Sequence, residues 1–239
     1  MLNVANTGKD SVRYRISVVQ MRMKEDGSFE TITQPDADQN FADQNFRFFP
    51  RTVVLGPNEA QTVKIQVTNT GSLTSGEYRS HLYFRAEADK KPLGEEETNK
   101  DTGAISVKIT AVFGISIPVI IRIGSEDSIN ASPRITIESG RLSTQKDSTT
   151  ALQVKFIREG QYSVYGDINV HHISPEGKTT LVSQARGMAI YTPNHVRYFN
   201  MQLDNSNGID YNKGKLKIVY TRPAEARASV MAEKEITLN

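Results

Sequence analysis

The sequence predicts an all-β protein, and three observations support this prediction. Short runs of alternating apolar and polar residues recur along the chain, and clusters of Gly, Pro, Asn and Asp separate them. The longest alternation extends from Ile105 to Ile121, where every odd-numbered residue is apolar. No stretch of about ten residues or more shows the 3.6-residue period of a helix. Many short strands at this spacing predict two tandem immunoglobulin-like β-sandwich domains.

The first predicted domain covers residues 1–124, a polar linker follows at 125–132, and the second domain covers 133–239. Turn residues separate the strands that we expect in the first domain, at residues 12–23, 28–32, 46–55, 61–68 and 77–86. Pro50 interrupts the third of these strands, and the charged residues 87–103 form a surface loop. In the second domain we expect strands at residues 134–137, 151–158, 165–173, 180–191, 195–203, 215–220 and 226–238.

The alternation from Ile105 to Ile121 is much longer than the roughly 5–6 residues of an ordinary strand. Pro118 has no N–H group to donate, which favours an edge strand or a strand end. A long apolar edge invites pairing with another chain. The pattern leaves two interpretations open: the protein's own core covers the apolar row, or the row is offered to a partner.

Composition excludes several classes of function. The chain has 239 residues and a net charge of +2, from 29 basic and 27 acidic residues, so we expect no nucleic-acid partner. It has no cysteine, which excludes disulfides and thiolate metal sites. No window has the roughly 18 apolar residues of a membrane helix, and the sequence shows no signal peptide.

The sequence offers no candidate for catalysis or metal binding. Residues 36–40 begin like a calcium loop, but Phe41 and Arg47 stand where the loop needs Gly and Glu. His171 and His172 are adjacent on a predicted strand, so they point to opposite faces and cannot chelate one ion together. No known catalytic motif is present. We therefore expect no enzyme, no cofactor and no bound metal.

Four segments, spread over the first predicted domain, resemble the periplasmic chaperones of pilus assembly, the PapD-like family. They are Asn3-Val-Ala-Asn-Thr-Gly8, Phe48-Phe-Pro-Arg-Thr-Val-Val-Leu-Gly-Pro57 with Gln61-Thr-Val-Lys64, Gly76-Glu-Tyr-Arg-Ser-His-Leu-Tyr-Phe-Arg85, and Phe113-Gly-Ile-Ser-Ile-Pro-Val-Ile-Ile-Arg122. The second domain matches by strand order and by Gly208-Ile-Asp-Tyr211.

The resemblance implies a periplasmic chaperone that binds pilus (fimbrial) subunits and delivers them to an outer-membrane usher. Subunits of this kind lack their last strand, and the chaperone completes them by donor-strand complementation. The side chains that the resemblance assigns to donation are Ile105, Val107, Ile109, Ala111 and Phe113. For Val119 and Ile121 we expect packing in the chaperone's own core.

Two departures from the family pattern matter. Pro118 stands where the family has a lysine that anchors the subunit's terminal carboxylate, so Pro118 cannot supply that anchor, and Arg122 is a candidate cation near the cleft. The chain also starts about where the family's second strand starts, with roughly twenty residues lacking on the family's usual domain length. We therefore expect low stability and self-association through exposed edge strands.

The resemblance also implies an interdomain ion pair between Arg122 and Asp210, with Glu87 as a third member. A second interpretation comes from a different class of protein, a tandem immunoglobulin-like surface or adhesive module that binds through its loops. A fully paired edge at residues 105–113, together with an aromatic patch on the loops, would favour that module.

Overall fold

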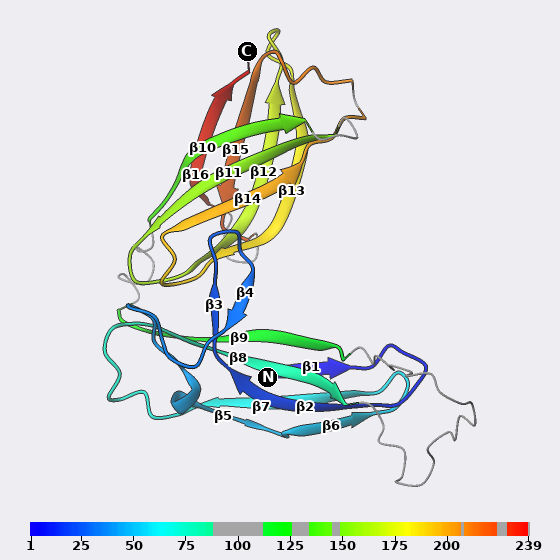
Figure 1. The fold of residues 1–239 in the computed structure, drawn as a ribbon, viewed down its shortest axis with the longest axis vertical. Helices are drawn as coiled ribbons and strands as arrows, with labels where there is room; N and C mark the ends of the chain where they lie inside the picture. Colours follow the sequence, from blue (N-terminus) through cyan, green and yellow to red (C-terminus); the bar gives the residue numbers. More distant parts are fainter. Residues whose placement is uncertain (88–111, 126–133, 145–148, 207, 224–228, 239) are drawn as a thin grey trace, which may run out of the picture. The chain divides into compact units, whose positions relative to one another are not determined.

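The computed structural model describes residues 1–87, 112–125, 134–144, 149–206, 208–223 and 229–238 (Figure 1). These residues form strands, turns and one short 3-10 helix, η1 (Asp43–Asn45), so the all-β prediction is confirmed. The chain divides into two compact units, and each is described by itself. Unit 1 comprises Met1–Gln20, Phe41–Leu73 and Arg79–Ile120, and unit 2 comprises Met21–Asn40, Thr74–Tyr78 and Ile121–Asn239.

Unit 1 is a β-sandwich of two sheets. One sheet has the order β1-β7-β5 and the other the order β6-β2-β8-β9. The strands are β1 (Leu2–Ala5), β2 (Val12–Val19), β5 (Phe46–Phe49), β6 (Thr52–Leu55), β7 (Ala60–Val67), β8 (Gly76–Glu87) and β9 (Gly114–Ile123). Strands β8 and β9 also extend into unit 2, at residues 76–78 and 121–123 respectively.

Alternate residues of the strands of unit 1 point into its core, as the period of two predicts. Ile16 of β2 lies opposite Phe84 of β8, and Tyr14 of β2 lies opposite Val53 of β6. The buried apolar side chains of unit 1 are Ile16, Ala42, Phe46, Val53, Leu55, Val63, Leu82 and Phe84.

Pro50 marks the point where the predicted strand 46–55 changes sheets. Strand β5 pairs with β7 in one sheet, and β6 pairs with β2 in the other. The Phe49–Pro50 peptide bond is cis. Because proline has no N–H group for a ladder, the chain leaves one sheet there and enters the other.

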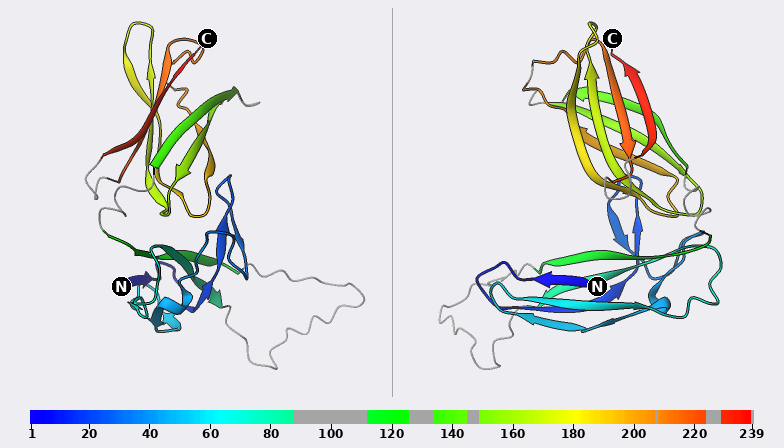
Figure 2. Two further views of the ribbon diagram at one scale, coloured as in Figure 1. Left: turned by 90° about the vertical axis from the view of Figure 1, so that its left-hand side faces the viewer. Right: turned by 180° about the vertical axis from the view of Figure 1, so that it is seen from behind.

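Unit 2 contains a second β-sandwich and a hairpin (Figures 1 and 2). The sheets have the orders β10-β11-β14 and β13-β12-β15-β16, and the hairpin is β3-β4. The strands are β3 (Met21–Met23), β4 (Phe29–Thr31), β10 (Arg134–Thr144), β11 (Thr150–Glu159), β12 (Val164–Ile173), β13 (Thr179–Ile190), β14 (Val196–Gln202), β15 (Lys215–Thr221) and β16 (Val230–Thr237).

The core of unit 2 lies between its two sheets. Leu152, Phe156, Ile168 and Ile218 are completely buried there. Gly140 of β10 is the close-approach point of the sandwich, because a Cβ atom on it would overlap Ile236 of β16. The glycine therefore allows β10 and β16 to approach each other.

Neither compact unit is one continuous stretch of sequence, whereas the predicted boundary at 124–133 divides the chain into two continuous domains. Met21–Asn40 and Thr74–Tyr78 come from the first half of the chain but group with unit 2. The linker 125–132 falls almost wholly outside the described residues. The boundary at residues 124–133 stays a prediction.

Candidate functional site

Strand β9 is the last strand in the sheet order β6-β2-β8-β9, within the residues that the structure describes. It runs antiparallel to β8 (Figure 1), and the Ala86 N–H donates to the Phe113 carbonyl at 2.9 Å. In an antiparallel ladder this bond places Ile115 opposite Phe84. Since Phe84 points into the core, Phe113 and Ile115 lie on the same inner side of the sheet.

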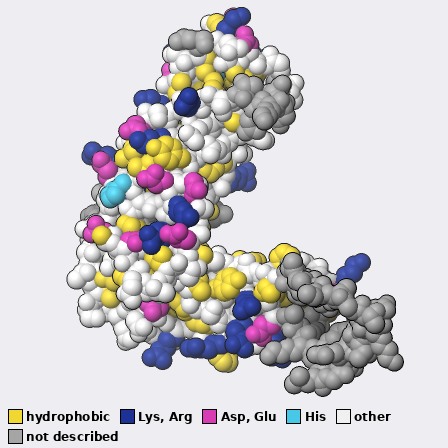
Figure 3. Space-filling model, in the orientation of Figure 1, with side chains coloured by type: hydrophobic (Ala, Val, Ile, Leu, Met, Phe, Trp, Pro, Cys, Tyr) yellow, Lys and Arg dark blue, Asp and Glu magenta, His cyan; other side chains and the backbone are white. Residues whose placement is uncertain are grey.

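Exposure along this inner side of β9 changes steeply. Phe113 is 76% exposed, Ile115 is 64% exposed, and Ile121 is only 6% exposed. Ile117 and Val119 are half-buried between them. Hydrophobic side chains are visible on the side of unit 1 along which β9 runs (Figure 3). The start of β9 therefore presents apolar side chains that the described part of unit 1 leaves uncovered.

The outer side of β9 is different. Gly114 lies against the ring of Tyr83, and a Cβ atom at position 114 would overlap that ring. Glu87 of β8 pairs with Arg15 of β2 at 2.7 Å. Tyr83 and this ion pair make the outer side largely polar and aromatic. Val112, which is on the same side as Gly114, is 47% exposed, so the larger exposed apolar side chains at the start of β9 are Phe113 and Ile115 on the inner side.

Of the predicted donor residues, Ile105, Val107, Ile109 and Ala111 lie outside the described residues. Phe113 is described and is among the most exposed apolar side chains. Their assignment to donation stays a prediction. Ile115 was not in the predicted set, although it continues the same odd-numbered row and could have been named from that parity.

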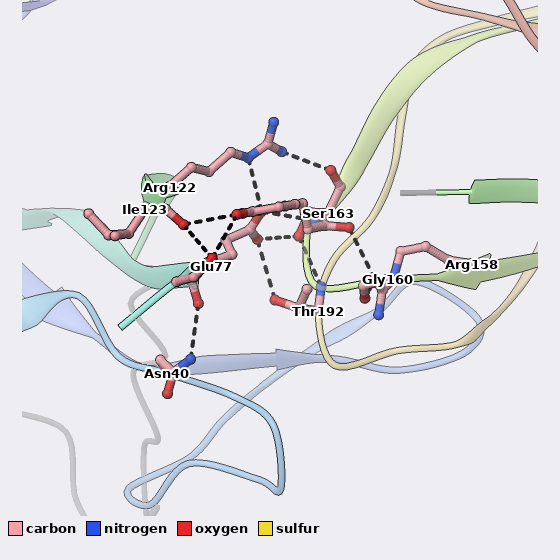
Figure 4. Close-up of polar contacts among 10 residues, drawn as sticks. Asn40, Glu77, Arg122, Ile123, Arg158, Gly160, Ser163 and Thr192 are labelled. Atoms are coloured by element: carbon pink, nitrogen blue, oxygen red, sulfur yellow. Dashed lines mark hydrogen bonds and ion pairs between the residues drawn. The ribbon is translucent and has the colours of Figure 1, made fainter. Parts of the chain in front are cut away.

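Glu77, at the start of β8, has a completely buried carboxylate with several donors (Figure 4). The backbone N–H of Ser163 donates to it at 2.8 Å, and the Ser163 hydroxyl also donates to it. The Thr192 hydroxyl donates at 3.3 Å and the Arg122 Nε at 3.2 Å. A buried carboxylate needs such donors, because leaving it without partners would cost several kcal/mol.

Arg122 connects this carboxylate to the neighbouring chain segment. Its Nη2 donates to the Ser163 carbonyl at 2.8 Å (Figure 4). Its guanidinium lies 5.9 Å from the centre of the Tyr162 ring. The Tyr162 hydroxyl in turn donates to the Ile123 carbonyl at 2.9 Å. The end of β9 is therefore attached to residues 162–163 of unit 2 through side chains on both segments.

The predicted partners of Arg122 need correction. In the structure Arg122 pairs with Glu77, whereas Asp210 accepts the Asn212 N–H at 3.0 Å and pairs with Lys213 at 3.5 Å. Glu87 pairs with Arg15. The physical reason is local: the Asp210 carboxylate is satisfied within its own turn, while the fully buried Glu77 carboxylate requires a nearby cation.

Glu77, Ser163 and Thr192 are not among the predicted site residues. They are distant in sequence, and no local pattern indicates that they meet. The strand begins Gly-Glu-Tyr-Arg-Ser-His, a mixed sequence that carries no sign of burial, and only the structure shows that it is buried along most of its length. An acidic residue in such a strand needs a partner elsewhere in the fold.

Two buried basic residues, Arg158 in unit 2 and His81 in unit 1, have lowered pKa values. Arg158 is almost completely buried and donates to the carbonyls of Asn194, Gly160 and Tyr162, at 2.7, 2.6 and 3.0 Å. Burial lowers the pKa of Arg158, and the nearby Glu77 carboxylate opposes this effect. Burial, followed by the nearby Arg79, lowers the pKa of His81 to about 4.

Over the described ranges of the chain, no group of three or more His, Cys, Asp or Glu side chains could hold a metal ion. In the same ranges, no helix is long and apolar enough to cross a membrane. The site geometry that remains is an open apolar strand edge at one end of β9 and a buried ionic cluster at its other end.

No known family profile matches the chain, and no curated protein matches it. Among solved structures, it is similar to the CupB2 chaperone of Pseudomonas aeruginosa, with 12% identity, a TM-score of 0.42, and coverage of 100% of this chain and 91% of that one. It is also similar to the Escherichia coli chaperone DraB, with 12% identity, a TM-score of 0.40, and coverage of 99% and 87%. A third similar structure is the Salmonella enterica SafA pilin in complex with the SafB chaperone, with 12% identity, a TM-score of 0.37, and coverage of 99% and 87%.

Proposed function

We propose that this protein is a non-catalytic periplasmic chaperone that binds pilus (fimbrial) subunits by donor-strand complementation and passes them to an outer-membrane usher. The observation that carries the proposal is the edge strand β9, whose inner-side residues Phe113 and Ile115 are mostly exposed. The sequence motifs that resemble PapD-like chaperones support the assignment of the partner.

An edge strand of this kind suits β-augmentation. Main-chain groups of β9 supply the ladder, and side chains at alternate positions enter pockets of the partner. Burying a large apolar side chain contributes about 1.5–3 kcal/mol, so the exposed fractions of Phe113 and Ile115 would together contribute about 2–4 kcal/mol. Residues Ile105, Val107, Ile109 and Ala111 extend the same row in the proposal.

The test is co-expression with a pilus subunit encoded in the same gene cluster, followed by purification of the complex. Phe113→Asp combined with Ile115→Asp should weaken the complex by about 30-fold or more, from the loss of about 2–4 kcal/mol. Both side chains are exposed, so the variant should keep the circular dichroism spectrum of the parent chain.

Val54→Asp is the matched control. Val54 is 55% exposed on β6, the opposite edge of the same sheet, and should tolerate the charge without loss of the complex. If the β9 variant retains the subunit as well as the Val54 variant does, the donor-strand assignment is wrong. Binding of a protein or glycan through loop residues, with no subunit bound, would favour a surface or adhesive module instead.

A further inference from the structure

The sheet β1-β7-β5 of unit 1 contains basic residues and no acidic ones. In this order its strands read Leu-Asn-Val-Ala, Ala-Gln-Thr-Val-Lys-Ile-Gln-Val and Phe-Arg-Phe-Phe. The charged side chains are Arg47 of β5 and Lys64 of β7. The positive charge of this sheet is therefore not balanced by any carboxylate within it.

Both charged side chains point away from the core of unit 1. On β5, Phe46 is 4% exposed and faces inward, so Arg47 and Phe49 face outward. On β7, Val63 is completely buried, so its neighbour Lys64 also faces outward. Arg47, Lys64 and the Phe49 ring therefore share the outer face of the sheet.

Phe49 is 73% exposed and is surrounded by cations. Lys64 is its partner across the ladder, and Arg47 is two residues away on the same side of β5. Arg51 follows β5; it is exposed, and its guanidinium lies 5.4 Å from the centre of the Phe48 ring. We call the surface formed by Arg47, Phe49, Arg51 and Lys64 the basic face. Lys and Arg side chains gather along the edge of unit 1 where β5 and β6 run (Figure 3).

The cations of the basic face have no acidic partner within the described ranges of the chain. The structure shows no ion pair there for Arg47, Arg51 or Lys64. On the sheet β13-β12-β15-β16 of unit 2, by contrast, Lys215 and Lys217 each pair with a glutamate of β16, at 3.3 and 3.1 Å. Unpaired cations around an exposed ring suit a partner that supplies negative charge.

Protection of the β5 edge does not account for this surface. Charged side chains on edge strands block unwanted pairing, which would explain Arg47 alone. Lys64, however, lies on β7, the central strand of its sheet. An outward phenylalanine such as Phe49 favours association and does not prevent it. The combination of cations and an aromatic ring therefore indicates a binding surface.

We propose that the basic face docks on the surface of an anionic lipid membrane. Cations near such a surface are attracted by the lipid phosphates, and an aromatic side chain among them enters the headgroup region. The cations come from two strands and the segment after β5, on an open face, so they match many separate phosphates better than they match one carboxylate. Subunit binding by β9 concerns the other sheet of unit 1, so the two proposals can fail separately.

The test is co-sedimentation of the full-length protein with vesicles of phosphatidylcholine, with and without phosphatidylglycerol. The parent chain should bind the anionic vesicles at least about tenfold more tightly than the neutral ones, and added salt should weaken this binding. Arg47→Gln combined with Lys64→Gln should weaken it by about 30-fold, at about fivefold for each cation. Lys215→Gln combined with Lys217→Gln is the matched control, because it removes the same charge from unit 2 and should bind as the parent chain does.

A fluorescent reporter locates the contact. The chain has no tryptophan, so Phe49→Trp introduces a single one. Its emission should shift to shorter wavelength with anionic vesicles, and brominated lipids should quench it. Tyr165→Trp is the control, since Tyr165 is a similarly exposed aromatic residue, at 54%, on β12 of unit 2. Its emission should not change.

Inorganic phosphate and polyglutamate, added in place of the vesicles, identify the occupant, and the proposal predicts that neither shifts the emission of Phe49→Trp. A shift with phosphate alone would assign the face to free phosphate, and a shift with polyglutamate but none with vesicles would assign it to an acidic protein segment; either result would overturn the proposal. Equal binding to neutral and anionic vesicles, or an equal loss of binding in the lysine control, would overturn it as well. The substituted side chains of the basic face are exposed, so the variants should keep the circular dichroism spectrum of the parent chain.

Discussion

The substitution Glu77→Gln tests the ionic cluster at the end of β9. The glutamine keeps the shape of the side chain but loses the charge, and its amide group presents N–H donors toward Arg122 and the Ser163 N–H, which are donors themselves. Removing one partner of a buried pair costs about 3–5 kcal/mol. For a chain of this size, 1 kcal/mol shifts Tm by about 2–4 °C, so we expect Tm to fall by about 6–20 °C.

The assay is thermal and urea unfolding of the full chain, with hydrogen exchange at Ser163 to assign the transition to unit 2. Exchange is needed because two units need not unfold in one step. Glu235→Gln is the control, since Glu235 is about half exposed and pairs with Lys215 at 3.3 Å. Such a pair contributes within about 1 kcal/mol.

A loss below about 1 kcal/mol in Glu77→Gln, equal to that of the control, would refute the reasoning that the buried carboxylate depends on its charge. It would mean that the hydrogen bonds from Ser163 and Thr192 satisfy a neutral side chain equally well. An intermediate loss that disappears when Arg122→Met is added would show instead that the ion pair itself carries the effect.

Three further predictions concern single side chains. Burial lowers the pKa of His81 to about 4, so the unfolded chain takes up a proton at a higher pH than the folded chain does, and the free energy of unfolding should fall by up to about 3 kcal/mol as the pH drops from about 6.5 to about 4. His81→Gln should remove that part of the pH dependence, as measured by urea unfolding. Gly140→Ala should cost about 1–3 kcal/mol, because its Cβ would overlap Ile236, whereas Gly71→Ala, with open space around it, should change urea stability little. Asn6→Ala should lower the free energy of unfolding by about 2–3 kcal/mol, because the Asn6 side-chain amide group donates to three backbone carbonyls and its oxygen accepts from the Gly8 N–H. A loss below about 0.5 kcal/mol in thermal unfolding would contradict this.

Much of the strand pattern could be predicted from the sequence, because alternation with a period of two reports directly which residues face a core. Strands β11, β12 and β13 begin and end within about one residue of their predicted bounds. Pro50 predicted a break, and the structure shows that the break is a change of sheet. Pro118 predicted an edge strand, and β9 is the last strand of its sheet among the described residues.

The ionic cluster around Glu77, and the contact of the β3–β4 hairpin with β14, could not be predicted in the same way. Alternation assigns a side chain to a face of its own strand, but it does not say which distant residue meets that face. The predicted ion pair between Arg122 and Asp210 therefore came from the resemblance alone. In the structure Arg122 pairs with the buried Glu77 carboxylate, and Asp210 pairs with Lys213. The sequence predicts strands at residues 12–23 and 28–32, but the hydrogen bond from the Tyr198 N–H to the Glu25 carbonyl, in the turn between them, is a contact that only the fold reveals.

The C-terminal end of strand β9 is held by side-chain hydrogen bonds, whereas its N-terminal end is exposed. This difference affects how β9 could pair with a strand of a partner. At its end, Arg122 donates both to Glu77 and to the Ser163 carbonyl. At its start, Phe113 and Ile115 are mostly exposed. A strand anchored at one end loses less conformational freedom when a second polypeptide pairs with the other end. In the proposed complex with a pilus subunit, Arg122→Met should therefore speed dissociation, even though Arg122 itself does not belong to the apolar row. A dissociation rate equal to that of the parent chain, measured by surface plasmon resonance, would show that the fixed end of β9 does not contribute to the proposed binding at its open end.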